Sequence, residues 1–275
     1  MTHEPAYICP ICKSALQQKN KTFVCESHHC FDIAKQGYVN LLPVQNKKST
    51  NPGDNKIMIQ SRKAFLNKRF YDLLITPCAT LIDRFIAERF DNCCLLDIGC
   101  GDGFFTRQIV AQLKQTAFCY GMDISKEAVK ASAKSDHSIA WFVASSNDIP
   151  LQDNSVDIVL KINAPLNYQK SLSKLSSNGI VISITPGESH LNGLKSIIYE
   201  HAQKHDKESC PDAYTNLTSL QLVQKMQLSN ETDIKNLFMM TPFYWNASQK
   251  NKDKIDELHE LRSDIAFDIN VWGKQ

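Results

Sequence analysis

A glycine turn directly after an apolar strand is the feature that most constrains this chain. Residues 93–98 are apolar except for one aspartate, as in a strand that is buried on both faces of a parallel sheet. The turn that follows contains Gly99, Gly101 and Gly103, which let the backbone bend tightly and approach a ligand closely. Asp123 ends a second apolar segment about 20 residues later, the spacing of a carboxylate that binds ribose hydroxyls. The pattern predicts a nucleotide-type site.

The spacing of the glycines favours one class of ligand. Asp97 precedes a G-x-G-x-G sequence, whereas a dinucleotide site more often has G-x-G-x-x-G and a helix N-terminus for the pyrophosphate. The form D-x-G-x-G-x-G resembles that of the class I methyltransferases, which bind S-adenosylmethionine, a molecule without phosphate. A zinc-containing NAD-dependent oxidoreductase is therefore the weaker alternative. An ordinary glycine turn would not explain why the glycines follow a strand, precede a helix and lie about 20 residues before Asp123.

The segments that follow alternate between helix and strand patterns, which predicts a doubly wound α/β sheet. We expect helices over 104–114 and 126–135, the second capped by Ser125, and strands over 117–124, 139–144, 156–162 and 179–185. Farther along we expect a helix over 190–201, a polar loop over 204–216, and antiparallel strands over 220–228 and 265–272 that flank a helix over 232–239. A ligand belongs at the carboxyl ends of the parallel strands, where we find Gly101, Asp123, Ser145 and Asn163.

The N-terminal segment has the pattern of a zinc ribbon. Cys9 and Cys12 form a C-x-x-C knuckle, and Cys25 follows after twelve residues. Sulfur and imidazole donors on two turns suit tetrahedral zinc. Spacing alone leaves the fourth ligand open among His28, His29 and Cys30. The rival interpretation, a redox C-x-x-C site, usually has a βαβ pattern beside it, which this segment lacks.

The charge of the chain is unevenly distributed. Residues 1–70 contain 11 Lys and Arg against 4 Asp and Glu, whereas the remainder contains 20 against 25, for a net charge of +2. A basic N-terminal part predicts an anionic partner, and a solvated basic surface is the alternative. We expect a polar loop over 45–56 and helices over 57–70 and 71–90. The basic residues predicted to contact the phosphates of such a partner are Lys47, Lys48, Arg62 and Lys63.

Two features bear on the location of the protein. The apolar runs are too short to span a membrane, and the first residues lack the apolar core of a signal peptide. We therefore expect a cytoplasmic protein, in which the ten cysteines are thiols or metal ligands rather than disulfides.

The order of the motifs resembles that of one family. The chain contains C-P-x-C, then Cys25 with His29, then F-D-x-A-K-x-G-Y-V-N-L-L-P, P-G-D, R-x-A-F-L and L-D-I-G-C-G-x-G. This order is similar to that of the bacterial 23S ribosomal RNA guanine-N1-methyltransferases (the RlmA or RrmA family), over nearly the whole chain. Short segments near Ser145, Thr185 and Met240 are similar too. Asn163-Ala164-Pro165 matches the N-P-P-Y loop of amino methyltransferases at only two positions, which favours a plain loop.

The resemblance implies a fold and a set of site residues. The fold is that of a class I S-adenosylmethionine-dependent methyltransferase with a small N-terminal zinc ribbon. The implied domains are a ribbon over 1–43, a basic loop and linking helices over 44–90, and a methyltransferase domain over 91–275. The implied zinc ligands are Cys9, Cys12, Cys25 and His29. The residues expected to bind the methyl donor are Tyr71, Asp97, Gly99, Gly101, Asp102, Gly103, Asp123, Ser145 and His190.

The resemblance also implies an activity. It is methyl transfer from S-adenosylmethionine to N1 of a guanine in a hairpin loop of 23S ribosomal RNA. N1 lies on the Watson–Crick edge, so the target has to be unpaired or flipped. The sequence identifies no general base and leaves a homodimer open. The non-enzymatic alternative, a zinc-ribbon RNA-binding protein with a non-catalytic methyltransferase fold, does not explain the intact glycine turn and Asp123.

Overall fold

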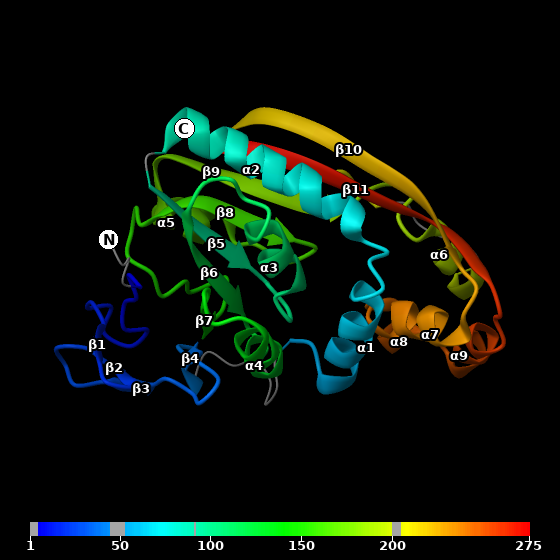
Figure 1. Ribbon diagram of the computed structural model, residues 1–275, viewed down its shortest axis with the longest axis horizontal. Coiled ribbons are helices and arrows are strands. Elements are labelled where there is room, and N and C mark those ends of the chain that lie inside the picture. The colour runs from blue at the N-terminus through cyan, green and yellow to red at the C-terminus, as the bar shows by residue number, and fades with distance from the viewer. Residues whose placement is uncertain (1–4, 45–52, 91, 200–204) are drawn as a thin grey trace.

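The computed structural model describes residues 5–44, 53–90, 92–199 and 205–275. An eight-stranded sheet with the order β10-β11-β9-β8-β5-β6-β7-β4 forms its centre, and a separate three-stranded sheet of β1, β2 and β3 lies at one side (Figure 1). The strands are β1 (Gln17–Lys19), β2 (Thr22–Val24), β3 (Cys30–Asp32), β4 (Val39–Asn40), β5 (Cys93–Ile98), β6 (Ala117–Asp123), β7 (Ala140–Val143), β8 (Val156–Ile162), β9 (Leu175–Pro186), β10 (Tyr214–Leu228) and β11 (Leu261–Lys274).

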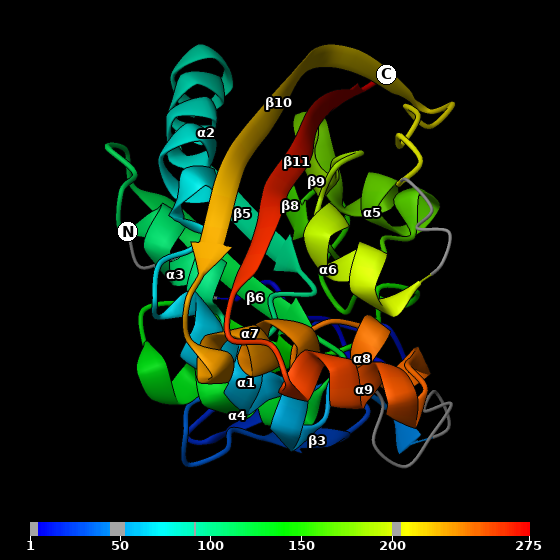
Figure 2. The same cartoon turned by 90° about the vertical axis from the view of Figure 1, so that its right-hand side faces the viewer.

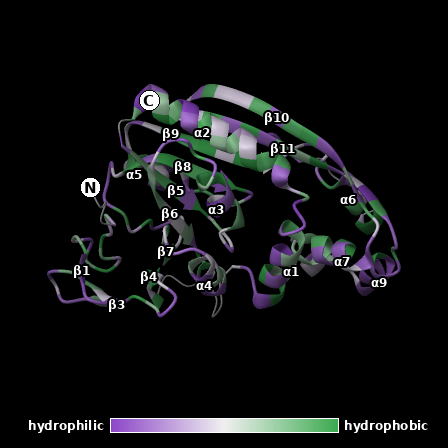
Figure 3. Ribbon diagram, in the orientation of Figure 1, coloured by the Kyte–Doolittle hydropathy of each residue, from purple (hydrophilic) through white to green (hydrophobic). Residues whose placement is uncertain are grey.

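Helices surround the large sheet, and four of them gather at one end of it (Figures 1 and 2). These four are α1 (Lys56–Leu66), α7 (Glu231–Met239), α8 (Phe243–Asn246) and α9 (Gln249–Asp256). The others are the 3-10 helix η2 (Asp72–Leu74), α2 (Ile75–Arg89), α3 (Phe104–Val110), α4 (Lys126–Ser135), α5 (Tyr168–Lys174) and α6 (Asn192–Ile198). Apolar and polar residues are mixed along the outer helices (Figure 3), as expected for amphipathic helices that bury one side.

The strand order creates a switch point in the middle of the sheet. Strands β4 to β9 are parallel, and β5 lies between β6 and β8. The chain therefore leaves β5 toward one side of the sheet and returns at β8 on the other side, where α/β proteins bind ligands. The predicted doubly wound sheet is confirmed. The two late strands are antiparallel as predicted, but longer, because β10 and β11 pair along almost their full lengths.

The two faces of the sheet are covered in different ways. Leu95, Cys119 and Trp141 belong to a core shared with α2, α3 and α4, whereas the alternate residues Tyr120 and Phe142 face the ribbon. Residues 144–155, between β7 and β8, form no helix that could cover this second face. The ribbon takes that place, together with α5.

Tyr7 carries the contact between ribbon and sheet. It is 2% exposed, and its ring lies 5.1 Å from that of Phe23 in the ribbon, 5.7 Å from that of Tyr120 and 5.2 Å from that of Phe142. The Tyr120 hydroxyl also accepts a hydrogen bond from the Ala6 backbone N–H at 2.6 Å. The ribbon therefore shares its core with the large sheet, which offsets the shortness of its own apolar core.

The predicted helices over 57–70 and 71–90 are each shorter than expected. The first ends at Leu66, and Arg69 beyond it has a left-handed backbone with φ of 65°. The second begins at Ile75, after the 3-10 turn η2. Pro77 has no N–H to donate to a carbonyl one turn earlier, so it is tolerated only in the first turn of a helix. Of the helix predicted over 190–201, residues 200 and 201 lie outside the described residues, and the described part forms α6; the short helices α8 and α9 were not predicted.

Within the described ranges, no helix is long and apolar enough to cross a membrane.

Candidate functional site

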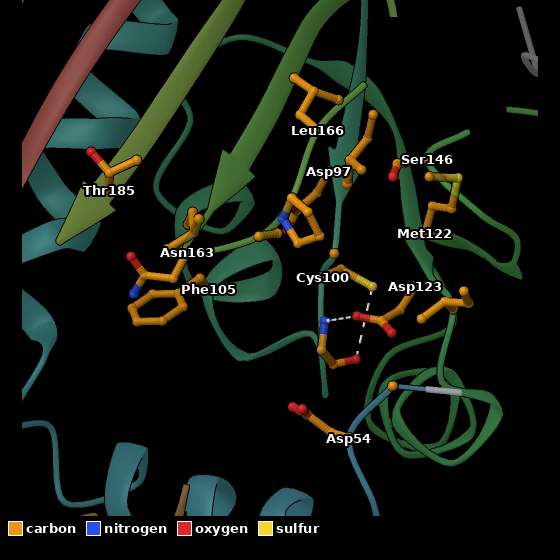
Figure 4. Close-up of a pocket in the computed structure, with 18 of the residues that line it drawn as sticks. Asp54, Asp97, Cys100, Phe105, Met122, Asp123, Ser146, Asn163, Leu166 and Thr185 are labelled. Carbon is orange, nitrogen blue, oxygen red and sulfur yellow. Dashed lines mark hydrogen bonds between the residues drawn. The ribbon is translucent and has the colours of Figure 1, made fainter. Parts of the chain in front are cut away.

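A cleft of about 1570 Å³ opens at the switch point, between the carboxyl ends of β5, β6 and β8 and the helix group around α1. Figure 4 shows side chains from the strand ends pointing into it. Every residue predicted to bind the methyl donor lines this cleft except Gly103. The lining residues of that prediction are Tyr71, Asp97, Gly99, Gly101, Asp102, Asp123, Ser145 and His190.

The three turn glycines have left-handed backbones, with φ of 75° at Gly99, 58° at Gly101 and 72° at Gly103. A Cβ at Gly99 would lie 2.3 Å from the Cβ of Ala164, and one at Gly103 would lie 2.6 Å from the Trp141 ring. Those two glycines therefore serve protein packing as well as the turn. Gly101 differs, because its nearest neighbour, a guanidinium nitrogen of Arg62 at 3.3 Å, is the end of a flexible side chain. The backbone at Gly101 is thus the part of the turn open to a ligand.

Asp123 ties the turn to the neighbouring strand. Its Oδ2 accepts the N–H of Gly101 at 3.0 Å (dashed in Figure 4), and its Oδ1 accepts the N–H of Ser125 at 2.7 Å. Burial raises the pKa of Asp123, and the two N–H groups oppose that rise. Each carboxylate oxygen has a second lone pair, so the group can still accept hydrogen bonds from two hydroxyls of a ligand.

Asp97 is a buried carboxyl group with one unpaired oxygen. It is 2% exposed, its Oδ2 accepts the Thr106 hydroxyl at 2.6 Å, and burial raises its pKa to about 7. Among the described residues, four buried side-chain polar atoms have no hydrogen-bond partner. Three of them, on Asp97, Thr185 and His205, belong to residues that line this cleft. Because an unpaired buried polar atom is costly, this concentration indicates a polar ligand that supplies the missing partners.

Tyr71 and His190 form a buried pair in the same cleft. The Tyr71 oxygen lies 3.4 Å from Nε2 of His190, and the backbone N–H of Ala266 donates to Nδ1 of His190 at 3.2 Å. Burial and the nearby His205 lower the pKa of His190 to about 3, so the ring is neutral. With Nδ1 accepting, the proton is on Nε2 and is donated to Tyr71. The hydroxyl proton of Tyr71 then remains available to a ligand.

Arg62 lies in this cleft and not on an outer RNA-binding face. Its guanidinium pairs with Asp54, and the backbone carbonyl of Asp54 accepts the Ser125 hydroxyl at 2.9 Å. The predicted contact residues Lys47 and Lys48 lie outside the described residues. Asp54 was not predicted to line the cleft, where it pairs with Arg62, although it belongs to the P-G-D motif.

The ribbon brings four potential metal ligands together. The ligand atoms of Cys9, Cys12, Cys25 and His29 all lie within 4.8 Å of one another. The Nδ1 atom of His29 is 3.3 Å from the sulfur of Cys25 and 3.5 Å from that of Cys9. Cys30, by contrast, is exposed and its thiol contacts the carbonyl of His28 at 3.4 Å. The geometry therefore selects His29 from the three candidates that spacing left open.

Hydrogen bonds lower the pKa of two of the three thiols in the cluster, Cys12 and Cys25, whereas burial raises the pKa of Cys9. Hydrogen bonds from Ser14 lower the pKa of Cys12 to about 5. Desolvation raises the pKa of Cys25, but the hydrogen bonds from His29 and Cys9 together outweigh it, so the pKa of Cys25 is lowered. Three thiolates and one imidazole are a donor set typical of structural zinc.

Comparisons with known proteins match both the ribbon and part of the region that forms the large sheet. Residues 7–50 match the family model described as "RlmA, N-terminal", a zinc ribbon, and residues 95–177 match a model described as "Methyltransferase domain". These matches confirm the predicted fold class and the two predicted cofactors, S-adenosylmethionine and zinc.

Three curated relatives are similar over most of their lengths. "Putative 23S rRNA (guanine-N(1)-)-methyltransferase YxjB" of Bacillus subtilis is 26% identical, over 96% of this chain and 94% of that protein. "23S rRNA (guanine(748)-N(1))-methyltransferase" of Streptomyces fradiae is 25% identical, over 95% of each. A Micromonospora griseorubida protein named "Putative 23S rRNA (guanine-N(1)-)-methyltransferase" is 30% identical over 68% of each.

Proposed function

Since the chain belongs to the 23S rRNA (guanine-N(1)-)-methyltransferase family, we propose that it transfers a methyl group from S-adenosylmethionine to N1 of a guanine in 23S ribosomal RNA. The observation that carries the proposal is that similarity to the B. subtilis relative extends over 96% of the chain, and so includes both the ribbon and the cleft. The methyl donor supplies an activated methyl group on a sulfonium centre. The protein then has to position a guanine and take one proton from it.

Different residues of the cleft bind different parts of the methyl donor. Asp123, with lone pairs left on both oxygens, binds the ribose hydroxyls, and Ser145 at the end of the next strand contacts the adenine. The unpaired oxygen of Asp97 accepts from the ammonium group, and the hydroxyl of Tyr71 donates to the carboxylate. These roles are supported by unused hydrogen-bonding capacity at each position, and the open backbone at Gly101 leaves room for the nucleoside.

The RNA target is a guanine in a hairpin loop. N1 is hidden in a base pair, so the base has to be unpaired or extruded before the cleft can hold it. The basic N-terminal part, residues 1–70, supplies the positive charge for the RNA backbone. With such a substrate, we also propose that the protein acts in the cytoplasm.

The ribbon holds zinc through Cys9, Cys12, Cys25 and His29. We divide the chain into a ribbon over 1–43, linking segments over 44–90 and a methyltransferase domain over 91–275. The shared core around Tyr7 supports a ribbon that moves with the methyltransferase domain rather than as an independent arm.

A homodimer would form most simply at the edge strand β10. This strand ends the sheet, and Val223 on it is 63% exposed. An edge strand of this length is a template for pairing with a second copy. Light scattering after size exclusion, with Val223→Lys as the variant, tests this: a dimer that the substitution converts to monomer supports it, and a monomeric wild type contradicts it.

The central experiment uses the full-length protein and 23S ribosomal RNA from cells that lack the modification. With methyl-labelled donor, we expect label in N1-methylguanosine, identified by nucleoside mass spectrometry, and a reverse-transcription stop at one guanine. Asp123→Ala is the matched inactive variant, and Asp212→Ala, at an exposed loop position, is the control. RNA binding without methylation would instead support the non-catalytic alternative, and calorimetric binding of NAD in place of S-adenosylhomocysteine would support the oxidoreductase.

A further inference from the structure

His205 belongs to the cleft but to none of the motifs discussed so far. It begins the described part of the loop that leads into β10, and it lines the cleft beside His190, with the two ring centroids 6.3 Å apart. Its Nε2 atom is buried and, among the described residues, has no hydrogen-bond partner. The hydroxyl oxygen of Thr185, near the end of β9, is likewise buried without a hydrogen-bond partner among the described residues, and Thr185 lines the same cleft. Two residues in the lining of one cleft thus each have a buried polar atom without a protein partner.

A partly buried carboxylate three residues farther on holds this loop in place. Glu208 accepts hydrogen bonds from the ammonium of Lys161 at 2.7 Å and from the hydroxyls of Tyr168 and Ser183. Lys161 and Ser183 are paired neighbours on β8 and β9. Through Glu208, the loop of His205 is therefore attached to β8 and β9, and the residues that follow Lys161 and Ser183 on these strands lead into the cleft.

The ends of those strands complete the site. Asn163 follows β8 with a left-handed backbone, φ of 52°, and Thr185 lies near the end of β9; both line the cleft, as does Phe105, which Figure 4 shows near Asn163. Asparagine adopts this conformation more readily than most residues other than glycine. The lining of the cleft thus includes an aromatic ring, an amide, a hydroxyl and an imidazole, which are groups that stack on a base and bind its edge.

From this arrangement we propose that Nε2 of His205 accepts the proton of guanine N1 during methyl transfer. The inference rests on the proposed function. The proton of N1 passes to Nε2, and the electron pair of the broken N1–H bond stays on N1 and forms the bond from N1 to the methyl carbon. The bond between that carbon and sulfur breaks, and its electron pair stays on sulfur. The sulfonium becomes a neutral thioether and the imidazole becomes an imidazolium, so the net charge of the cleft is unchanged. The proton passes afterwards to solvent.

The surroundings keep His205 ready to accept a proton. Burial and the positive charge of Lys195 on α6 lower the pKa of His205, and Asp206 raises it by less. The facing ring of His190 is itself neutral, because burial depresses its pKa strongly. His205 is therefore neutral near pH 7 and has one ring nitrogen free of a proton.

Apart from Asp97, the other carboxyl groups and the second histidine of the cleft already have protein partners, among them Asp102, whose Oδ1 accepts the N–H of Phe104 at 3.4 Å. The acceptor nitrogen of His190 is occupied by the N–H of Ala266, and Asp123 holds the glycine turn. Asp54 pairs with Arg62, and Asp148 pairs with Lys13. Asp97 remains, but its free oxygen is assigned to the ammonium of the donor.

The test compares His205→Ala, His205→Gln and the control His259→Ala, whose side chain is 85% exposed and does not line the cleft. Each full-length protein is assayed with the unmodified RNA from pH 6 to 9, and calorimetry gives its affinity for S-adenosylhomocysteine. We expect kcat at pH 7 to fall about 100- to 10,000-fold in both His205 variants, with KM and the S-adenosylhomocysteine affinity within about threefold of wild type. The control retains its activity.

Two further readouts separate proton transfer from simple positioning. The His205→Ala rate should rise about tenfold per pH unit as N1 loses its proton unaided, while the wild-type rate levels off, and added imidazole should restore part of the activity. Glu208→Gln, at a positioning residue, should lower kcat less and keep the wild-type pH profile.

The outcomes distinguish the two hypotheses. Wild-type protein that makes no N1-methylguanosine refutes the proposed function and this inference with it. Active wild-type protein with His205→Ala within twofold of its kcat refutes the inference alone. A loss of kcat matched by an equal loss of S-adenosylhomocysteine affinity, without imidazole rescue, also refutes it.

Discussion

Replacing Asp97 by asparagine should make the free protein more stable and the methyl donor bind less well. The carboxyl group is 2% exposed and its pKa is raised from 3.8 to about 7 by burial. The folded state therefore holds the proton more tightly than the unfolded chain, and stability present below about pH 4 is lost as the pH rises toward 7. A difference of about 3 between the pKa values of Asp97 in the folded and unfolded states corresponds to about 4 kcal/mol in the free energy of unfolding. The amide of the variant would be neutral at every pH and would avoid this loss.

The expected signature is a difference between the two proteins that depends on pH. Near pH 4 the free energies of unfolding should be nearly equal, and by pH 8 the variant should be more stable by up to about 4 kcal/mol. Urea unfolding of the zinc-loaded proteins at pH 5, 6, 7 and 8 measures this through the transition midpoints. Asp212→Asn, at an exposed position, is the control and should run parallel to wild type.

Ligand binding should change in the opposite direction. A charge-assisted hydrogen bond is worth about 1.5 to 3 kcal/mol, so the variant should bind S-adenosylhomocysteine about 10- to 100-fold less tightly. Wild-type protein near pH 6.5 should also release a proton on binding, detected calorimetrically in buffers of different ionisation enthalpy. The reasoning fails if the unfolding midpoints of variant and wild type stay a constant distance apart from pH 5 to 8, or if the affinities are equal.

Three other predictions concern the ribbon and the RNA. Tyr7→Ala, which removes the aromatic contact between ribbon and sheet, should lower the free energy of unfolding by about 3 to 5 kcal/mol in chemical denaturation; the exposed Ile11→Ala should change it by under about 0.5 kcal/mol, and equal effects would contradict the shared core. Cys12→Ser should abolish stoichiometric zinc in metal analysis while Cys30→Ser retains it, and retention by both would contradict the ligand set. RNA affinity should fall steeply between about 50 and 200 mM salt in filter binding, and Lys63→Ala should reduce that slope by about one; affinity that does not depend on salt would argue against a basic contact surface.

Several elements follow from local patterns in the sequence. Strands over 93–98 and 156–162 and the helix over 126–135 are present with the predicted bounds, and Ser125 caps that helix by accepting the N–H of Ala128 at 3.3 Å. Apolar runs, helical periodicity and caps involve residues a few positions apart. The same holds for the glycine turn, whose left-handed backbone only glycine adopts without strain.

Other features were decided only when distant segments came together. Spacing left three candidates for the fourth zinc ligand, and the fold of the ribbon brings His29 to the three thiols. A charge count placed Arg62 with the RNA-binding residues, and the fold pairs it with Asp54 inside the cleft. Lys161 lies near the end of β8, and the fold buries its charged side chain against Glu208.

The division has a physical cause. The groups that surround a buried charge or an unpaired buried atom after folding set its protonation state and the free energy that its burial costs. The sequence by itself therefore determined the sheet, the glycine turn and the class of methyl donor. Tertiary structure alone placed the ribbon on the open face of the sheet and fastened the loop of His205 above the cleft.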